Sequence, residues 1–195
     1  FNTAVGFQTL RYNTASSNTA VGWNALRDNT SGSSNTAVGM RCLANNLTGN
    51  QNSGMGFECL QVNTSGSGNS AIGHQALQAN SSGLYNVAFG KDALGASTAS
   101  FNTAAGMLSG DGITSGSYNT ALGYNALPST TTASNNSAAG AFAGIGGNFT
   151  NTTAIGAGAF PTASNRINIG TALSNNLTGG YGSWQNFSDA RFKRD

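Results

Sequence analysis

The chain has 195 residues, a formal net charge of +2 and only 7% charged residues, whereas a soluble domain averages about one quarter. This composition excludes a basic field for nucleic acid or a membrane surface, so we expect neither as a partner. No run of about eighteen apolar residues exists, which excludes a membrane-spanning helix and membrane insertion by one. Apolar residues still make up 38%, so the chain can bury surface through many small contacts.

A five-residue motif recurs along the chain: Asn, then Thr or Ser, then Ala, a larger apolar residue and Gly. Eleven copies follow one another at intervals of 14 to 17 residues. Helical solenoid repeats need about 33 to 47 residues, so we expect two short strands and two turns in each copy. Stacked copies predict an all-β fold, a parallel β-solenoid of eleven repeats over residues 1–186. The copies begin at Asn2, Asn18, Asn35, Asn52, Asn69, Asn86, Asn102, Asn119 and Asn136, with degenerate ones at Thr152 and Arg166.

Two positions of the motif restrict its geometry. The fifth is glycine in every copy, as expected where the backbone takes a positive φ or another segment approaches closely. The third is nearly always Ala, as at Ala20 and Ala37, so that face of the strand is expected to meet a site without room for a larger side chain. The structural repeat glycines are Gly6, Gly22, Gly39, Gly56, Gly73, Gly90, Gly106, Gly123, Gly140, Gly156 and Gly170.

The fourth position, for example Val21 or Ile72, is also apolar. Neighbouring residues of a strand point to opposite faces, so both faces of the predicted strand are apolar and expected to be buried. A single thin solenoid covers only one of them. An uncovered apolar row along a rod favours aggregation, and this predicts a closed homo-oligomer.

The segments NTAVGxxAL and NSAIGHQAL resemble the repeated NSxAIGxxA motif in the heads of YadA-like trimeric autotransporter adhesins. They are also similar to repeats in tail-fibre proteins of phages and large viruses. The resemblance extends from Asn2 to about Asn186. It implies a left-handed parallel β-roll in each chain and three chains packed side by side into a homotrimeric fibre.

Residue types that often carry chemistry have simpler interpretations here. Cys42 and Cys59 share a column that is mostly Ala, which favours buried free thiols over a disulfide and predicts no metal site and no cofactor. His74 lies in a variable column that is expected to face solvent. Glycan cleavage needs two poised carboxylates, whereas the acidic residues fall on different turns and are interpreted as isolated surface charges. They are Asp28, Glu58, Asp92, Asp111, Asp189 and Asp195.

Two polar columns leave alternatives open. Asn29, Asn46, Asn63 and Asn80 share a column, and each begins an Asn-x-Ser/Thr sequon. A ladder of stacked turn asparagines explains this column more simply than glycosylation does. A row of hydroxyls at the second motif position, interrupted at Val87, raises an ice-binding solenoid as a distant alternative.

The end of the chain differs from the rest, because five of its last seven residues are charged. The stretch SDARFK, from Ser188 to Lys193, resembles the SDxRxK entry motif of the C-terminal intramolecular chaperone of endosialidases, phage tail fibres and myelin regulatory factors. Phe192 stands where that family usually has Leu. The resemblance implies that residues 187–195 begin a chaperone domain that helps the fibre to trimerise and then cuts itself off.

This second resemblance assigns Ser188 as a nucleophile and Lys193 as its general base. A serine hydroxyl becomes nucleophilic once a base takes its proton, and a desolvated lysine can act as that base. Asp189 and Arg191 are the other motif residues. We expect single-turnover self-cleavage at Ser188 in a longer parent chain that continues beyond Asp195, and no other enzymatic activity.

The two resemblances together predict a structural segment of a phage or viral tail fibre. Its expected partners are two further copies of itself, the chaperone domain, and a receptor or glycan of the host surface to which its loops are presented. The head of a bacterial trimeric adhesin is the alternative. The expected location is a virion tail fibre or a cell surface.

Overall fold

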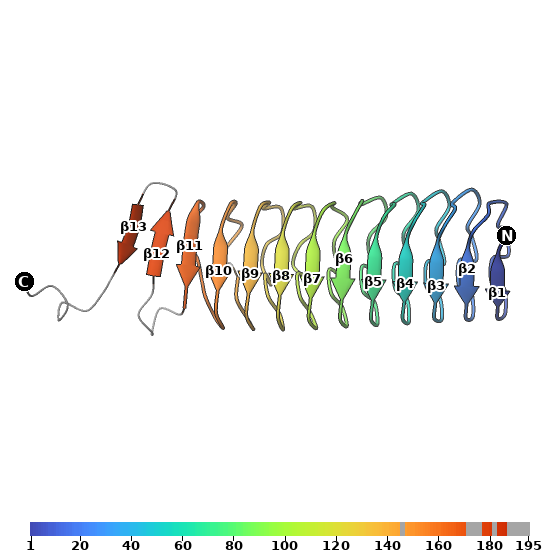
Figure 1. Ribbon diagram of the computed structural model, residues 1–195, viewed down its shortest axis with the longest axis horizontal. Coiled ribbons are helices and arrows are strands. Elements are labelled where there is room, and N and C mark those ends of the chain that lie inside the picture. The colour runs from blue at the N-terminus through green and yellow to red at the C-terminus, as the bar shows by residue number, and fades with distance from the viewer. Residues whose placement is uncertain (145–146, 171–176, 181–182, 187–195) are drawn as a thin grey trace, which may run out of the picture.

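The protein is a rod of stacked rungs, shown by a computed structural model that describes residues 1–144, 147–170, 177–180 and 183–186 (Figure 1). Eleven strands pair in parallel, each with the next along the chain. The predicted parallel β-solenoid is therefore confirmed. The strands are Thr3–Val5 (β1), Thr19–Val21 (β2), Thr36–Val38 (β3), Ser53–Met55 (β4), Ser70–Ile72 (β5), Val87–Phe89 (β6), Thr103–Ala105 (β7), Thr120–Leu122 (β8), Ser137–Ala139 (β9), Thr153–Ile155 (β10) and Arg166–Ile169 (β11).

Each rung contains one strand of three or four residues, so the expectation of two strands per copy is wrong. The second half of the rung turns because alternate residues take the left-handed conformation, such as Asn24 at φ 57° and Leu26 at φ 47°. Such residues cannot continue an extended strand. No described residue lies in a helix, and hence the described part of the chain offers no helix that could cross a membrane.

The parallel stacking gives way to antiparallel pairing at one end of the rod. The strands Leu177–Gly180 (β12) and Ser183–Asn186 (β13) pair antiparallel with β11 and with each other. The motif has degenerated by this point, since Arg166 replaces the motif Asn, and an antiparallel strand needs only a short connection. The segment expected to be solenoid through residue 186 thus ends in a different topology.

The interior of the rod consists of small and branched apolar side chains in register. Ala20 pairs with Ala37 in the sheet, and both are fully buried. A column of leucines faces them from the second half of the rung. These leucines combine complete burial with φ near 50°, a conformation that bulky residues rarely adopt. They are Leu26, Leu43, Leu60, Leu77, Leu94 and Leu127.

In one rung the core leucine is absent, and a residue three positions further along the chain fills its space. Gly110 takes the left-handed leucine position, with φ 65°, and the fully buried Ile113 fills the space. A Cβ at Gly110 would lie 2.9 Å from Leu94 Cδ2 and 3.2 Å from Ile113 Cδ1. Ile113 therefore fills the core volume of the missing leucine, although the leucine of the repeat pattern is absent at this position.

The repeat glycines have both properties that the sequence predicts. All eleven have positive φ, and Gly39 is typical with φ 136°. A Cβ added to Gly39 would lie 2.3 Å from the carbonyl oxygen of Gly56 in the next rung. Any side chain would therefore push adjacent rungs apart, and the glycine column sets how closely the rungs stack.

Buried asparagines form ladders along the rod, as expected for the sequon column. Nδ2 of Asn46 donates to Oδ1 of Asn29 at 2.6 Å and to the carbonyl oxygen of Gly49 at 2.9 Å. Asn63 repeats the pattern with Asn46. These side chains are fully buried, so the folded rod does not expose these amides for glycosylation.

The motif asparagines form a second ladder of the same kind. The backbone N–H of Asn52 donates to Oδ1 of Asn35 at 2.9 Å, while Nδ2 of Asn52 donates to the carbonyl oxygen of Gly66 at 2.8 Å. The ladder thereby satisfies backbone groups that would otherwise be unpaired in the interior.

Cys42 and Cys59 are buried free thiols, as predicted. A hydrogen bond with the Cys59 thiol and burial both raise the pKa of the Cys42 thiol, so that it stays protonated. Cys42 also explains why Gly54 replaces the motif alanine, because a Cβ at Gly54 would lie 2.6 Å from Cys42 Sγ. The larger thiol thus takes the volume of a missing methyl group.

Candidate interaction surfaces

The outer face of the sheet carries two parallel rows of side chains. One row consists mainly of Thr and Ser, and the other is the fourth motif position, which is apolar throughout. In the single chain this apolar row is solvent-accessible, with Met55 51% and Ile72 44% exposed. In the single chain, therefore, only the inner face of the strand is buried, whereas burial was expected for both faces. The row consists of Val5, Val21, Val38, Met55, Ile72, Phe89, Ala105, Leu122, Ala139, Ile155 and Ile169.

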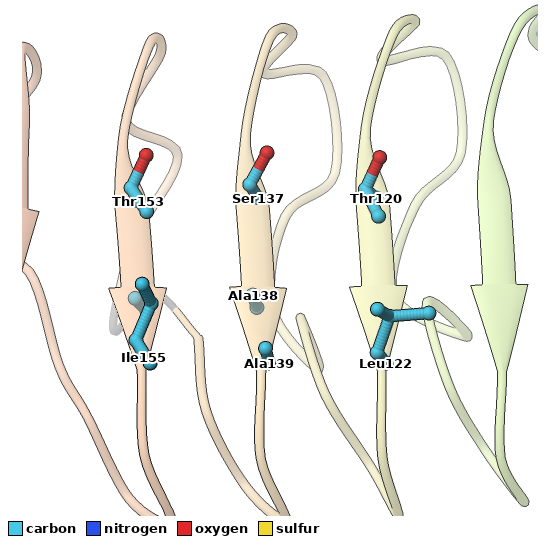
Figure 2. A pocket seen from close by; sticks show the side chains of 8 residues that line it. Thr120, Leu122, Ser137, Ala138, Ala139, Thr153 and Ile155 are labelled. Carbon is cyan, nitrogen blue, oxygen red and sulfur yellow. The ribbon is translucent and has the colours of Figure 1, made fainter. Parts of the chain in front are cut away.

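Small residues hollow this outer face in two places. Figure 2 shows Ala139 between the longer side chains of Leu122 and Ile155, with Ser137 in the adjacent hydroxyl row. The resulting depression has a volume of about 150 Å³. A smaller one of about 80 Å³ lies beside Met55, where Gly54 replaces the motif alanine. The face therefore combines a row of hydroxyls with an uneven apolar row, unlike a flat plane of hydroxyls.

Before β11, charged residues lie outside the strands. No charged residue occurs in β1 to β10, and the charges before β11 all fall one to six residues after a repeat glycine. A second copy could consequently approach the outer sheet face without bringing like charges together.

Three acidic residues, Asp28, Glu58 and Asp92, form ion pairs, which corrects the expectation that they are isolated surface charges. Glu58 is 8% exposed and accepts hydrogen bonds from Arg41 at 2.8 Å and from Gln75 at 3.0 Å. Asp28 pairs with Arg27. Arg27 and Asp28 are adjacent in the chain, whereas Arg41 and Glu58 occupy the same repeat position in successive rungs. The expectation of isolated charges overlooked both kinds of pair.

His74 is half exposed, in keeping with its predicted position. Its ring stacks on Phe57 with a centroid distance of 5.2 Å, and its Nδ1 lies 3.8 Å from Asp92 Oδ1. Partial burial, followed by the charge of Asp92, raises the pKa of the nearby Asp111. No nucleophile in the described part of the chain joins this group, and we assign it no catalysis.

An exposed stack of aromatic rings lies at the corner of the rung that precedes the strand. Phe101 stacks on Tyr85 with a centroid distance of 5.5 Å and on Tyr118 with a centroid distance of 4.9 Å. The rings come from three consecutive rungs. Sequence reasoning missed this stack, although the aromatic residues recur at intervals of 16 and 17 residues directly before the motif asparagine.

The residues assigned to self-cleavage, Ser188 and Lys193 with Asp189 and Arg191, lie outside the described residues. Within the described ranges, no three His, Cys, Asp or Glu side chains group together as they would to hold a metal ion. Comparisons of the chain with known protein families, with curated proteins and with solved structures found no match.

Proposed function

We propose that this chain is a structural segment of a homotrimeric fibre, as in the tail fibre of a phage or virus. The observation that carries the proposal is the apolar row along the outer sheet face, which the single chain leaves uncovered. Contiguous exposed apolar patches mark interaction sites in soluble proteins. Packing against further copies would bury it, and cyclic closure would stop growth at a defined number of chains.

The chemistry of the surface supports a partner identical to the chain itself. Strands β1 to β10 carry no charge, so copies aligned side by side place apolar rows together without electrostatic repulsion. Three copies is the number implied by the resemblance to trimeric adhesins and tail fibres. The head of a bacterial trimeric adhesin is the alternative, since it would use the same rod and the same face.

Light scattering tests the assembly. The fragment should have about three times the chain mass of 19.6 kDa. Leu122→Asp places a charge in the apolar row and should give single chains that keep their β-sheet circular dichroism. Val62→Asp changes an exposed apolar residue outside the row and should leave the trimer intact. A wild-type fragment that is folded and monomeric at micromolar concentration would refute the trimer.

We also propose that a parent chain continuing into the chaperone is cut at Ser188. Ser188→Ala removes the proposed nucleophile, and Lys193→Ala removes the proposed base. Both variants of the long parent should stay full length on a denaturing gel and should still trimerise. Cleavage of Ser188→Ala at the wild-type position would show that the assignment is wrong.

The exposed hydroxyl row keeps ice binding as a distant alternative. Ice binding needs a regular plane, whereas Val87 interrupts the hydroxyls and Phe89 and Met55 project beside them. We therefore expect no thermal hysteresis from the folded fragment. Hysteresis that disappears in Thr19→Tyr and Thr36→Tyr would favour ice binding over the fibre.

A further inference from the structure

The corner column, defined as the residue directly before the motif asparagine of each rung, changes its chemistry between β8 and β9. It takes a positive φ from Ser17 onward, and its residues are exposed or partly exposed. In three consecutive rungs it is aromatic, and in the next three it is an amide. From Ser17 on, the column reads Ser17, Ser34, Gln51, Gly68, Tyr85, Phe101, Tyr118, Asn135, Asn151 and Asn165.

The aromatic rings cover one another except at one end. The rings of Phe101 and Tyr118 are nearly parallel, with an interplanar angle of 3°. At the other end Tyr85 lies over Gly68, where an added Cβ would be 2.6 Å from the ring atom Cδ1. Gly68 thus covers the outer face of Tyr85, whereas no described aromatic ring stacks on the face of Tyr118 toward Asn135. Tyr118 is 59% exposed.

An amide lies beside this ring face. Asn135, the next residue of the corner column, is exposed. One rung further, Nδ2 of Asn151 donates to Oδ1 of Asn165 at 2.8 Å. The backbone N–H of Asn135 donates to the carbonyl oxygen of Ser117 at 3.1 Å, which holds the amide one rung from the ring.

Folding alone does not favour aromatic residues in this column. Asparagine and glycine tolerate a positive φ, whereas bulky residues seldom adopt one. The other rungs use Ser, Gln, Gly or Asn, with Phe1 heading the column. The three consecutive aromatic residues at φ of 54° to 60° stack on one another, which offsets this backbone preference. Tyr118 ends the stack, so ring stacking within the chain does not use its face toward Asn135.

We infer that the junction of Tyr118 and Asn135 binds a neutral sugar residue of a surface polysaccharide. A pyranose has an apolar C–H face that packs on an aromatic ring and a rim of hydroxyls that pairs with an amide, which can donate and accept. The inference rests on the attachment role proposed above and names its ligand class. Rigid placement by the rung ladder limits the ordering that binding requires.

The distribution of charge distinguishes a sugar from a nucleic acid. Bases also stack on aromatic side chains, but strand binding depends on cations that neutralise phosphates. Residues 92–165 contain no Lys or Arg. A neutral ligand is therefore the one that this surface fits.

Affinity electrophoresis tests the site with the whole chain. The gels contain neutral polysaccharides built from glucose, mannose, galactose or N-acetylglucosamine, with polysialic acid as an acidic comparison. At least one neutral polysaccharide should retard the wild type. Tyr118→Ala and Asn135→Ala should each weaken that affinity at least tenfold. Tyr12→Ala, which removes an exposed tyrosine outside the corner column, should leave it unchanged.

Light scattering on the same samples separates this inference from the trimer proposal. Retardation of a protein that proves monomeric would leave the sugar site standing and refute the trimer. A trimer that none of the neutral polysaccharides retards would overturn the sugar site alone. Dissociation of the Tyr118→Ala trimer would also overturn it, because the column would then be a contact between chains.

Discussion

Ala138 and Ala139 are adjacent alanines of β9 that lie in opposite environments. Ala138 is 2% exposed and points into the rod, in a column that is Ala in nearly every rung. Ala139 points outward, in a row where other rungs hold Val, Met, Ile, Phe, Leu or, at Ala105, a second Ala. Inside the rod, one residue size is repeated because each rung stacks on an identical neighbour, whereas nothing in the chain itself limits the outer row.

The largest effect should come from breaking the stacking distance itself. Gly39→Ala places a Cβ 2.3 Å from the Gly56 carbonyl oxygen at φ 136°. Since backbone atoms cannot yield as a side chain can, we expect a loss of about 3 kcal/mol or more in the free energy of unfolding. Urea unfolding measures it, with Met40→Ala, at the exposed next residue, as the control. A loss below about 1 kcal/mol would show that adjacent rungs are not held this closely.

The two alanines of β9 give the most direct test of the comparison. Ala138→Leu overpacks the interior and should lower the free energy of unfolding by about 2 to 3 kcal/mol. Ala139→Leu should change it by less than about 0.5 kcal/mol, since its side chain enters the open depression. Both are measured by urea unfolding in the Leu122→Asp background, which separates folding from assembly. Equal losses would mean that the two strand faces are not distinct.

Removing one step of the interior ladder should have a smaller but clear effect. Asn46→Ala deletes the hydrogen bonds to Asn29 and Gly49 and leaves Asn63 Nδ2 without its Oδ1 acceptor. An unsatisfied buried group costs about 1 to 3 kcal/mol, so we expect a loss of about 2 kcal/mol. Thermal unfolding of Asn45→Ala, at a partly exposed neighbour, provides the control. Comparable melting temperatures for the two variants would argue against the ladder.

The smallest effect concerns the exchange of volume between Cys42 and Gly54. Gly54→Ala alone should cost about 1 to 2 kcal/mol, because the new methyl group meets Cys42 Sγ. Cys42→Ala removes the sulfur, so the double variant should regain most of that loss. A double-mutant cycle should therefore show a coupling of about 1 kcal/mol. If the losses in the free energy of unfolding are additive, contact with Cys42 does not explain why glycine occupies position 54.

Repetition explains how much of the fold could be predicted from the sequence. In a stacked solenoid each residue contacts the residue at the same position of the next copy. Aligning the repeats therefore predicts which residues are neighbours along the rod. Gly39 above Gly56, Ala20 beside Ala37 and Asn29 beneath Asn46 all follow from that rule. The unpaired apolar row followed as well, because alternation along a strand needs no tertiary information.

What lies across the rung was decided by the tertiary structure. The left-handed turns at residues such as Leu26 bring the second half of the rung back over the strand. A positive φ is rare for leucine, so the local sequence does not predict these turns. For the same reason the fit of Cys42 against Gly54 and the substitution of Ile113 at Gly110 became visible only in three dimensions. Neighbours along the rod are set by the repeat, whereas contacts across it depend on backbone turns whose dihedral angles the side-chain pattern does not specify.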